Sequence, residues 1–335
     1  MNIIETKNLT KSYGDFTAVS HLNMHIRKGT VYGFLGPNGA GKSTTMNIMT
    51  GCLAASAGEV KIGGFDIFEE PTQAKCLIGY LPEQPPVYLD RTPLEYLTFV
   101  ARAKNVPAGE INRQLAHAMS VTQITDVADR LIKNLSKGYR QRVGIAQALL
   151  GNPEVIILDE PTVGLDPKQI IEIRELIHSL GKNHTVILSS HILSEVQAVC
   201  QTILIISQGK LVACDTPENL EKLFAGTTTV ELTVEASEAE IRSILAPLPH
   251  ITQLHTQDLE SGRCTVTLET DQTVEDQSVC RDVFFAFSRA ERAILQMSTA
   301  KASLENIFLE LTREESEPSR TKRRAKPSEG TGDVQ

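Results

Sequence analysis

One segment of the sequence combines glycines with a lysine and a serine at a spacing that suits phosphate binding. Residues 36–43 read G-P-N-G-A-G-K-S, which fits the pattern G-x-x-x-x-G-K-[ST]. In such a loop the glycines let successive backbone N–H groups turn toward phosphate oxygens, and the helix that follows presents its positive end. The residues expected to contact a nucleotide here are Gly36, Pro37, Asn38, Gly39, Ala40, Gly41, Lys42, Ser43 and Thr44.

Two side chains of this loop have chemistry of their own. Lys42 is placed to reach the β- and γ-phosphates and is a candidate catalytic residue, and Ser43 is a candidate ligand of Mg²⁺. The alternative is a glycine-rich turn with an incidental lysine. The position of the loop between an apolar strand and a helix favours phosphate binding. Alone, the loop predicts only that a nucleoside triphosphate binds.

Two adjacent carboxylates follow another apolar run. Asp159 and Glu160 come directly after V-I-I-L. Asp159 suits the Mg²⁺ site, which an aspartate of this kind shares with the serine of the loop. Glu160 is then the candidate catalytic residue that polarises an attacking water. The alternative is that two charges simply surface where a buried strand ends, and the presence of the phosphate loop argues against it.

The elements that must position these residues alternate between strands and helices. The runs V-Y-G-F-L, E-V-I-I-L, H-T-V-I-L and Q-T-I-L-I-I are apolar throughout, as strands buried on both faces of a parallel sheet are. Helical stretches are expected at about 139–150, 168–180 and 192–199. This alternation predicts an α/β fold with a mostly parallel sheet whose ligands bind at the carboxyl ends of the strands.

A further segment resembles the signature sequence of the ABC ATPase family. Residues 135–139 read L-S-K-G-Y, which is similar to the family's L-S-G-G-Q, and an arginine-rich helix start follows. The resemblance implies a P-loop NTPase fold with a helical subdomain, and ATP and Mg²⁺ as cofactors. It also implies that Ser136 and Gly138 contact the γ-phosphate of an ATP held by the other protomer of a dimer.

The resemblance extends to three more positions in the same order. Asp166, in P-T-V-G-L-D-P, matches the acidic position of the family's D-loop, and His191, in L-S-S-H, matches its catalytic switch histidine. Tyr13 matches the aromatic residue that stacks on adenine, although a tyrosine near an edge strand has an ordinary structural explanation too. These motifs cover roughly residues 1–222.

The sequence departs from the family pattern at two places. Glu83, a possible third ligand of the metal, stands where the family usually has glutamine, and Gln84 follows it, so which side chain acts there stays open. Lys137 and Tyr139 replace the commonest glycine and glutamine of the signature. Lys137 adds positive charge beside the expected γ-phosphate.

The chain divides into three parts by composition. Residues 1–222 are expected to form the ATP-binding domain, in which about 85–130 resembles the helical subdomain that grips membrane subunits. Residues 227–312 read β-α-β-β-α-β, which predicts a small ferredoxin-like α+β domain, followed by a helix that begins at Ser303. Residues 313–335 are charged and poor in apolar side chains, so we expect a disordered tail.

Composition narrows the function classes. The net charge of −8 argues against a surface that grips nucleic acid, so no nucleic-acid partner is expected. The six cysteines form no C-x-x-C pair, as expected for reduced thiols rather than a zinc site. The N-terminus has no signal-peptide pattern, and no apolar run is long enough to span a bilayer. A membrane role must therefore involve partner chains.

Within the ABC family the chain is most similar to ATPases of ABC-2 type exporters, on the strength of the Y-L-P-E loop, L-S-K-G-Y-R-Q-R-V-G and the S-L-E-N-I-F-L-E-L ending. This implies an ATP-hydrolysing subunit that acts as a homodimer or heterodimer with separate transmembrane permeases. It would lie in the cytoplasm at the inner face of the cell membrane. The alternative is a soluble ABC ATPase of translation or DNA repair, but the two nucleotide domains or coiled-coil insertion of such proteins are missing.

Two regions outside the ATP-binding domain have open roles. The unit at 227–312 would be either a ligand-sensing regulator or an aid to dimerisation. The basic stretch at 320–326 has the composition of a segment that contacts anionic lipid, but flanking acids favour a solvated end.

Overall fold

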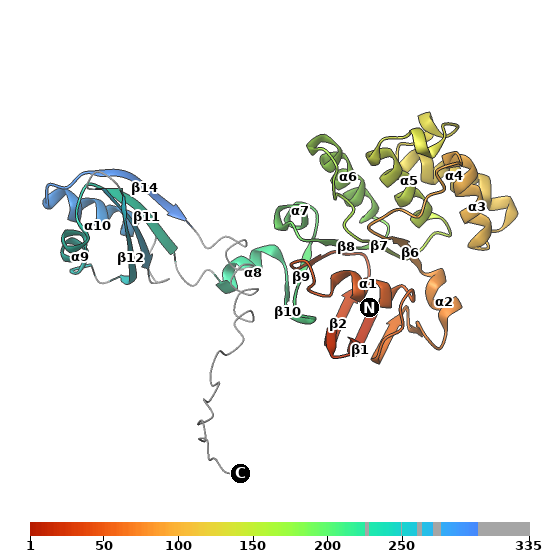
Figure 1. The fold of residues 1–335 in the computed structure, drawn as a ribbon, viewed down its shortest axis with the longest axis horizontal. Coiled ribbons are helices and arrows are strands. Elements are labelled where there is room, and N and C mark those ends of the chain that lie inside the picture. Colours follow the sequence, from red (N-terminus) through yellow and green to blue (C-terminus); the bar gives the residue numbers. More distant parts are fainter. Residues whose placement is uncertain (225–227, 249, 260–262, 271–275, 301–335) are drawn as a thin grey trace, which may run out of the picture.

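The computed structural model describes residues 1–224, 228–248, 250–259, 263–270 and 276–300. The expected domain boundary near Gly226, the helix expected from Ser303 and the tail expected over 313–335 lie outside the described residues. The described chain contains three β-sheets, each with a hydrophobic core of its own or shared with a neighbour (Figure 1).

A six-stranded sheet forms the centre of the first part of the chain. Its strand order is β10-β9-β3-β8-β7-β6, and all neighbours pair in parallel except β10, which is antiparallel to β9. The apolar runs of the sequence become its inner strands because helices and a second sheet cover both faces. The strands are β3 (Val31–Leu35), β6 (Ile78–Leu81), β7 (Val155–Leu158), β8 (Thr185–Ser190), β9 (Thr202–Ser207) and β10 (Lys210–Asp215).

A second, antiparallel sheet is built from strands on either side of β3 in the chain, and it differs from the strand–helix alternation expected over residues 1–222. Its order is β2-β1-β4-β5. It packs with α1 (Lys42–Met49) against the central sheet around a core that includes Phe34, Met46 and Ile62. The strands are β1 (Asn2–Tyr13), β2 (Phe16–Arg27), β4 (Ala57–Ile62) and β5 (Phe65–Asp66).

The remaining helices of this part, other than the one at Pro71–Cys76, surround a core on the other side of the central sheet, which includes Leu35, Leu158 and Leu188. Figure 1 shows α3, α4 and α5 grouped together beyond the β6 side of that sheet. The expected helices at 139–150, 168–180 and 192–199 correspond to α5, α6 and a shorter α7. The bounds are α2 (Pro71–Cys76), α3 (Pro93–Ala103), α4 (Ala108–Val121), the 3₁₀ turns Thr125–Val127 and Ile132–Asn134, α5 (Lys137–Leu149), α6 (Pro167–Leu180), α7 (Leu193–Gln197) and α8 (Pro217–Phe224).

The third sheet is antiparallel, with the order β12-β13-β11-β14. Alternate residues of its strands, among them Leu232, Val266 and Leu268, are buried against two helices in a separate core. The elements are β11 (Thr228–Val234), α9 (Glu238–Leu245), β12 (Ile251–Leu259), β13 (Arg263–Thr270), α10 (Asp276–Arg289) and β14 (Ile294–Ala300). Among the described residues, no helix is long and apolar enough to cross a bilayer.

Candidate active site

The phosphate loop connects the end of β3 to the start of α1. Gly39 and Gly41 have φ angles of 83° and 99°, in the left-handed region that side chains with a Cβ rarely adopt. A Cβ on Gly41 would also overlap the carbonyl oxygen of Ala18 in β2. These two positions therefore require glycine, and the loop closes around the N-terminus of α1.

The ammonium group of Lys42 lies inside this loop. Its Nζ donates hydrogen bonds to the carbonyl oxygens of Gly36 at 2.8 Å and Pro37 at 3.2 Å, and lies 3.7 Å from Oε1 of Glu160. The side chain is only 6% exposed. Burial lowers the pKa of Lys42, and the nearby carboxylates of Glu160 and Asp159 oppose that shift. A buried cation held in this way suits an anionic ligand.

Ser43 and Asp159, the two residues expected to hold Mg²⁺, contact each other across the loop. The hydroxyl of Ser43 donates to Oδ1 of Asp159 at 3.2 Å, and the hydroxyl of Ser189, at the end of β8, donates to the same oxygen. The described residues contain no cluster of three or more His, Cys, Asp or Glu side chains that would hold a metal without help. Two oxygen donors fit Mg²⁺, which usually combines one or two protein ligands with phosphate oxygens and water.

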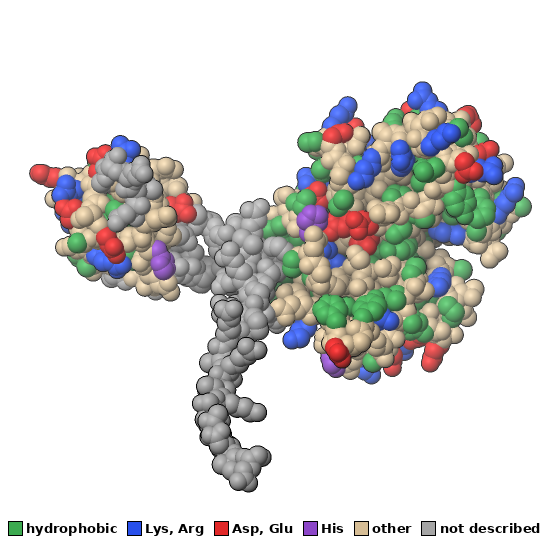
Figure 2. Space-filling view, viewed as in Figure 1, with side chains coloured by type: hydrophobic (Ala, Val, Ile, Leu, Met, Phe, Trp, Pro, Cys, Tyr) green, Lys and Arg blue, Asp and Glu red, His purple; other side chains and the backbone are tan. Residues whose placement is uncertain are grey.

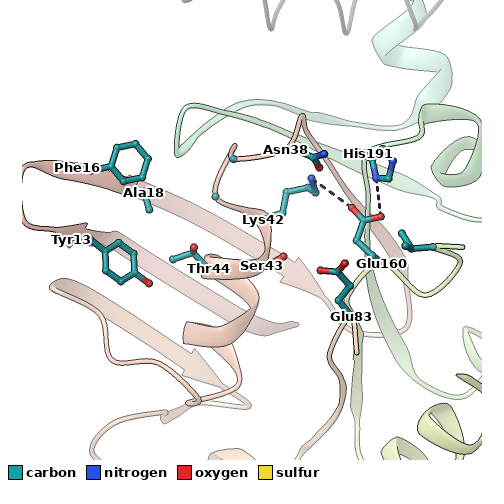
Figure 3. Close-up of a pocket in the computed structure, with 13 residues that line it drawn as sticks. Tyr13, Phe16, Ala18, Asn38, Lys42, Ser43, Thr44, Glu83, Glu160 and His191 are labelled. Atoms are coloured by element: carbon teal, nitrogen blue, oxygen red, sulfur yellow. Dashed lines mark hydrogen bonds and ion pairs between the residues drawn. The ribbon is translucent and has the colours of Figure 1, made fainter. Parts of the chain in front are cut away.

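Glu160 and His191 form a pair at the carboxyl ends of β7 and β8. The Nδ1 atom of His191 lies 3.0 Å from Oε2 of Glu160. Glu160 has a φ of 47°, which is uncommon for a residue other than glycine, and its backbone N–H donates to the hydroxyl of Ser189. This backbone conformation turns the carboxylate toward Lys42, so one carboxylate contacts a lysine and a histidine together (Figure 3).

Lys42, Ser43, Glu160 and His191 line one cavity of about 450 Å³. In Figure 3 the carboxylate of Glu83 points into the space between Ser43 and Glu160, and Glu83 lines the cavity whereas Gln84 does not. On the face shown in Figure 2, acidic side chains gather in a hollow beside a patch of apolar side chains. The lining residues are Tyr13, Phe16, Ala18, Asn38, Gly39, Gly41, Lys42, Ser43, Thr44, Glu83, Glu160, Val163 and His191.

Two aromatic rings stand at one end of the cavity, away from the carboxylates (Figure 3). Tyr13 and Phe16 are paired across the β1–β2 hairpin and are 50% and 63% exposed. The Nζ of Lys11 lies over the Tyr13 ring, 5.2 Å from its centre, and donates to the carbonyl of Ala54. Sequence reasoning selected Tyr13 but missed Phe16. The two-residue Gly-Asp turn between them indicates a hairpin, which would have predicted that Phe16 lies opposite Tyr13.

Ser136 and Gly138 do not line this cavity. Both lie at the start of α5, where the Ser136 hydroxyl accepts a hydrogen bond from the backbone N–H of Tyr139 at 3.3 Å. They line a separate hollow of about 300 Å³ that Asp166, the N-cap of α6, also lines. The described chain therefore holds a phosphate loop and a signature segment that do not face each other.

The sequence of this chain is similar to those of transport ATPases. A family model described as "ABC transporter" matches residues 19–163. The linearmycin resistance ATP-binding protein LnrL of Bacillus subtilis is 31% identical over 312 residues, which are 92% of this chain and 98% of that protein. The bacitracin transport ATP-binding protein BcrA of Bacillus licheniformis is 40% identical over 211 residues, 62% of this chain and 68% of that protein.

The fold is similar to that of solved ATP-binding cassettes. A dimeric cassette, MJ0796, in a post-hydrolysis state bound to ADP and Pi, is 27% identical, with a TM-score of 0.58 over 64% of this chain and 98% of that chain. One chain thus contains the phosphate loop, the Glu160–His191 pair and the signature segment at the start of α5. The same chain matches LnrL over 98% of that protein. The chain is a member of the ABC transporter ATP-binding proteins and is an ATP hydrolase.

Proposed function

We propose that this chain supplies the energy for export through an ABC transporter by hydrolysing ATP in the cavity of Lys42 and Glu160. The observation that carries the proposal is the single cavity in which a buried lysine, two carboxylates and a histidine surround the phosphate loop. Relatives named for bacitracin transport and for lantibiotic transport support a role in transport.

Each side chain has a distinct role in this proposal. Lys42 binds the β- and γ-phosphates, and Ser43 and Asp159 would hold Mg²⁺, which would supply positive charge beside the phosphates. Glu160 accepts a proton from the attacking water. His191 orients the Glu160 carboxylate through their 3.0 Å contact. Glu83 lines the cavity and is available to the metal or to a water that binds it.

The variant Glu160→Gln tests the base. It keeps the size of the side chain but removes the proton acceptor, so we expect ATP binding to persist while turnover falls by about 100-fold or more. The variant should accumulate as an ATP-bound dimer in size-exclusion chromatography. Near wild-type hydrolysis by this variant would show that Glu160 is not the base.

We further propose that two copies, or this chain and another ATPase subunit, bind ATP between them. Ser136 and Gly138 lie at the N-terminal end of α5, whose positive dipole end suits a phosphate, yet they lie outside the cavity of their own chain. Figure 2 shows Lys and Arg side chains spread over the part of this face that carries α5 and α6. In a head-to-tail dimer this end of α5 would cover the partner's phosphate loop.

A mixing experiment tests this composite site. Lys42→Ala should inactivate the phosphate loop, and Ser136→Phe should block the signature. Each variant alone should be inactive, but a refolded mixture should regain roughly a quarter of the wild-type rate, because half of the dimers would contain one complete site. A mixture that stays as inactive as its components, although cross-linking shows mixed dimers, would contradict the shared site.

The contact with the membrane subunits is assigned to the helical segment at about 85–130. Its exposed face carries the rings of Tyr88 and Phe99, whose centroids are 5.5 Å apart, and Tyr88 also packs edge-on against the buried ring of Tyr96 at 5.6 Å. Exposed apolar patches of this kind are typical of protein interfaces. This interaction would hold the chain in the cytoplasm, at the inner face of the cell membrane, beside its permease.

For the C-terminal unit we propose a ferredoxin-like domain. The element order β-α-β-β-α-β and the antiparallel sheet order β12-β13-β11-β14 support this fold. The domain would span about 227–312 beside an ATP-binding domain of about 1–222. Its role would be to sense a ligand or to strengthen the dimer, and truncation near Gly226 followed by measurement of ATPase rate and dimer affinity would separate these roles.

A further inference from the structure

A buried carboxylate lies behind the active site without lining its cavity. Glu195, on α7, is 6% exposed. Its Oε2 accepts a hydrogen bond from the hydroxyl of Thr162 and another, at 3.1 Å, from the hydroxyl of Ser190. Burying a carboxylate is costly unless hydrogen bonds compensate for the lost water. These two bonds are therefore strong constraints on the residues that donate them.

The two donors belong to the two segments that carry the catalytic pair. Thr162 follows Glu160 by two residues, and Ser190 directly precedes His191. The Ser190 hydroxyl also accepts a hydrogen bond from the backbone N–H of Ile192 at 3.0 Å, so it fixes the chain on both sides of the histidine. One carboxylate oxygen thus joins the segment after β7 to the segment after β8.

Glu160 needs such a constraint on its C-terminal side. Its φ of 47° is an unfavourable conformation that the surroundings must impose. On the N-terminal side, the hydrogen bond from its N–H to Ser189 supplies one restraint. On the other side, Thr162 is the nearest residue with a buried side-chain hydrogen bond, and that bond ends on Glu195.

Glu195 itself is held by the packing of α7. Its neighbour Val196 is fully buried and lies so close to Gly33 of β3 that a Cβ on this glycine would overlap it. The helix α7 therefore packs against the central sheet. This packing holds the Glu195 carboxylate in place between the ends of β7 and β8. Its position is set by the core and not by solvent.

We propose that Glu195 is a positioning residue for ATP hydrolysis: by holding Thr162 and Ser190 on one oxygen, it sets the separation of Glu160 and His191. The proposal rests on the proposed roles of Glu160 and His191. Charge-assisted hydrogen bonds of this kind are stronger than neutral ones, and misplacing a catalytic group by about 1 Å lowers a rate by about 100-fold.

The test compares Glu195→Leu with Glu195→Gln. Leucine removes the acceptor, so we expect kcat to fall by about 10- to 100-fold while the ATP dissociation constant stays within about threefold. Glutamine keeps one oxygen that can accept both hydroxyls, so it should restore most of kcat. Equal losses of kcat in the two variants, or no loss in Glu195→Leu, would overturn the proposal.

Two further measurements separate positioning from a general loss of stability. Thr162→Val removes one donor, and adding it to Glu195→Leu should lower kcat little further, because the bond from Thr162 to Glu195 is already lost. Thr185→Val is the matched control, since it removes a buried hydroxyl at the opposite end of β8 that accepts the N–H of Gly29 at 2.9 Å. It should lower the melting temperature and leave kcat unchanged. Fully additive losses, or a comparable kcat loss in the control, would contradict positioning.

The Glu160→Gln variant, measured in the same assay, distinguishes this inference from the proposed function. If Glu160→Gln stops turnover and Glu195→Leu does not, only the positioning role fails. If Glu160→Gln keeps turnover, the assignment of the base fails, and with it the ground for this inference.

Discussion

At the scale of single residues, the cavity separates two kinds of recognition. The phosphate end carries charge, with Lys42 and Glu160 both buried, whereas the other end consists of the exposed rings of Tyr13 and Phe16. Charged groups confined to a cavity discriminate strongly between ligands whose phosphate groups carry different charges. We expect the aromatic end to supply mainly a stacking surface, which would contribute affinity and take little part in the chemistry.

This division leads to a prediction for the aromatic end. Removing a stacking ring costs roughly 1–3 kcal/mol of base binding, so Tyr13→Ala should raise the KM for ATP by roughly 10- to 100-fold with little change in kcat. Phe16→Ala should raise it less, because Phe16 is the more exposed ring. Steady-state kinetics are the measurement, and Phe65→Ala, an exposed ring elsewhere in the same sheet, is the control. A change confined to kcat would argue against stacking.

At the scale of elements, one lysine ties the helical segment to the signature helix. Lys104, the C-cap of α3, donates to the carbonyls of Gln147, Ala148 and Leu150 at the end of α5, with the shortest distance, 2.8 Å, to Leu150. A cation at the C-terminal end of a helix complements the helix dipole. Burial nevertheless lowers the pKa of Lys104 to about 8.

The lowered pKa predicts a dependence of stability on pH. Between pH 8 and the unfolded pKa of 10.5, the unfolded chain binds more protons at this site than the folded chain. The free energy of unfolding should therefore rise with pH in this window, by at most about 3 kcal/mol at 1.4 kcal/mol per pKa unit. Urea denaturation at several pH values is the measurement.

The comparison with Lys104→Met isolates this contribution. Burial raises the pKa of Tyr96 to about 12, which makes stability fall above pH 10 and opposes the lysine. Only the difference between wild type and variant is therefore informative. The rise should vanish in Lys104→Met and persist in Lys75→Met, an exposed neighbour. Identical pH slopes in wild type and Lys104→Met would refute the assignment.

At the scale of the whole molecule, separate cores divide the described chain. The first two sheets contribute side chains to a common core near the phosphate loop. In contrast, Val230, Leu268 and Phe287 belong to a core that contains only residues from β11 onward. A unit with a core of its own is expected to unfold as its own cooperative step. Nucleotide binding and the third sheet should therefore respond to different mutations.

Leu268→Ala tests this separation. Truncating a buried leucine costs about 2–5 kcal/mol, so the variant should lower the temperature of one calorimetric transition and leave the ATPase rate below that transition unchanged. Leu180→Ala, at the last residue of α6 and in the core of the first part of the chain, should lower the temperature of the other transition. A single transition that moves equally in both variants would indicate one cooperative unit.

In the antiparallel sheet that contains β1 and β2, the sequence pattern did not predict the strands. β1 and β2 are 12 residues each, but Asn8 and His21 have φ angles of 49°, and the pairing register shifts near them. Such bulges interrupt the alternation by which a half-buried strand is recognised. The parallel strands were predictable because their burial on both faces produces continuous apolar runs.

The candidate site divides in the same way. The sequence by itself determined the phosphate loop, the acids after β7 and the signature segment, because each depends on neighbouring residues and their spacing. Only the tertiary structure decided that Ser189 donates to the Asp159 carboxylate and accepts the Glu160 backbone N–H, that Phe16 stands beside Tyr13 and that Glu195 joins the segments of Glu160 and His191. These contacts depend on which strands are neighbours in a sheet, and strand order arises from packing over the whole domain and not from local spacing.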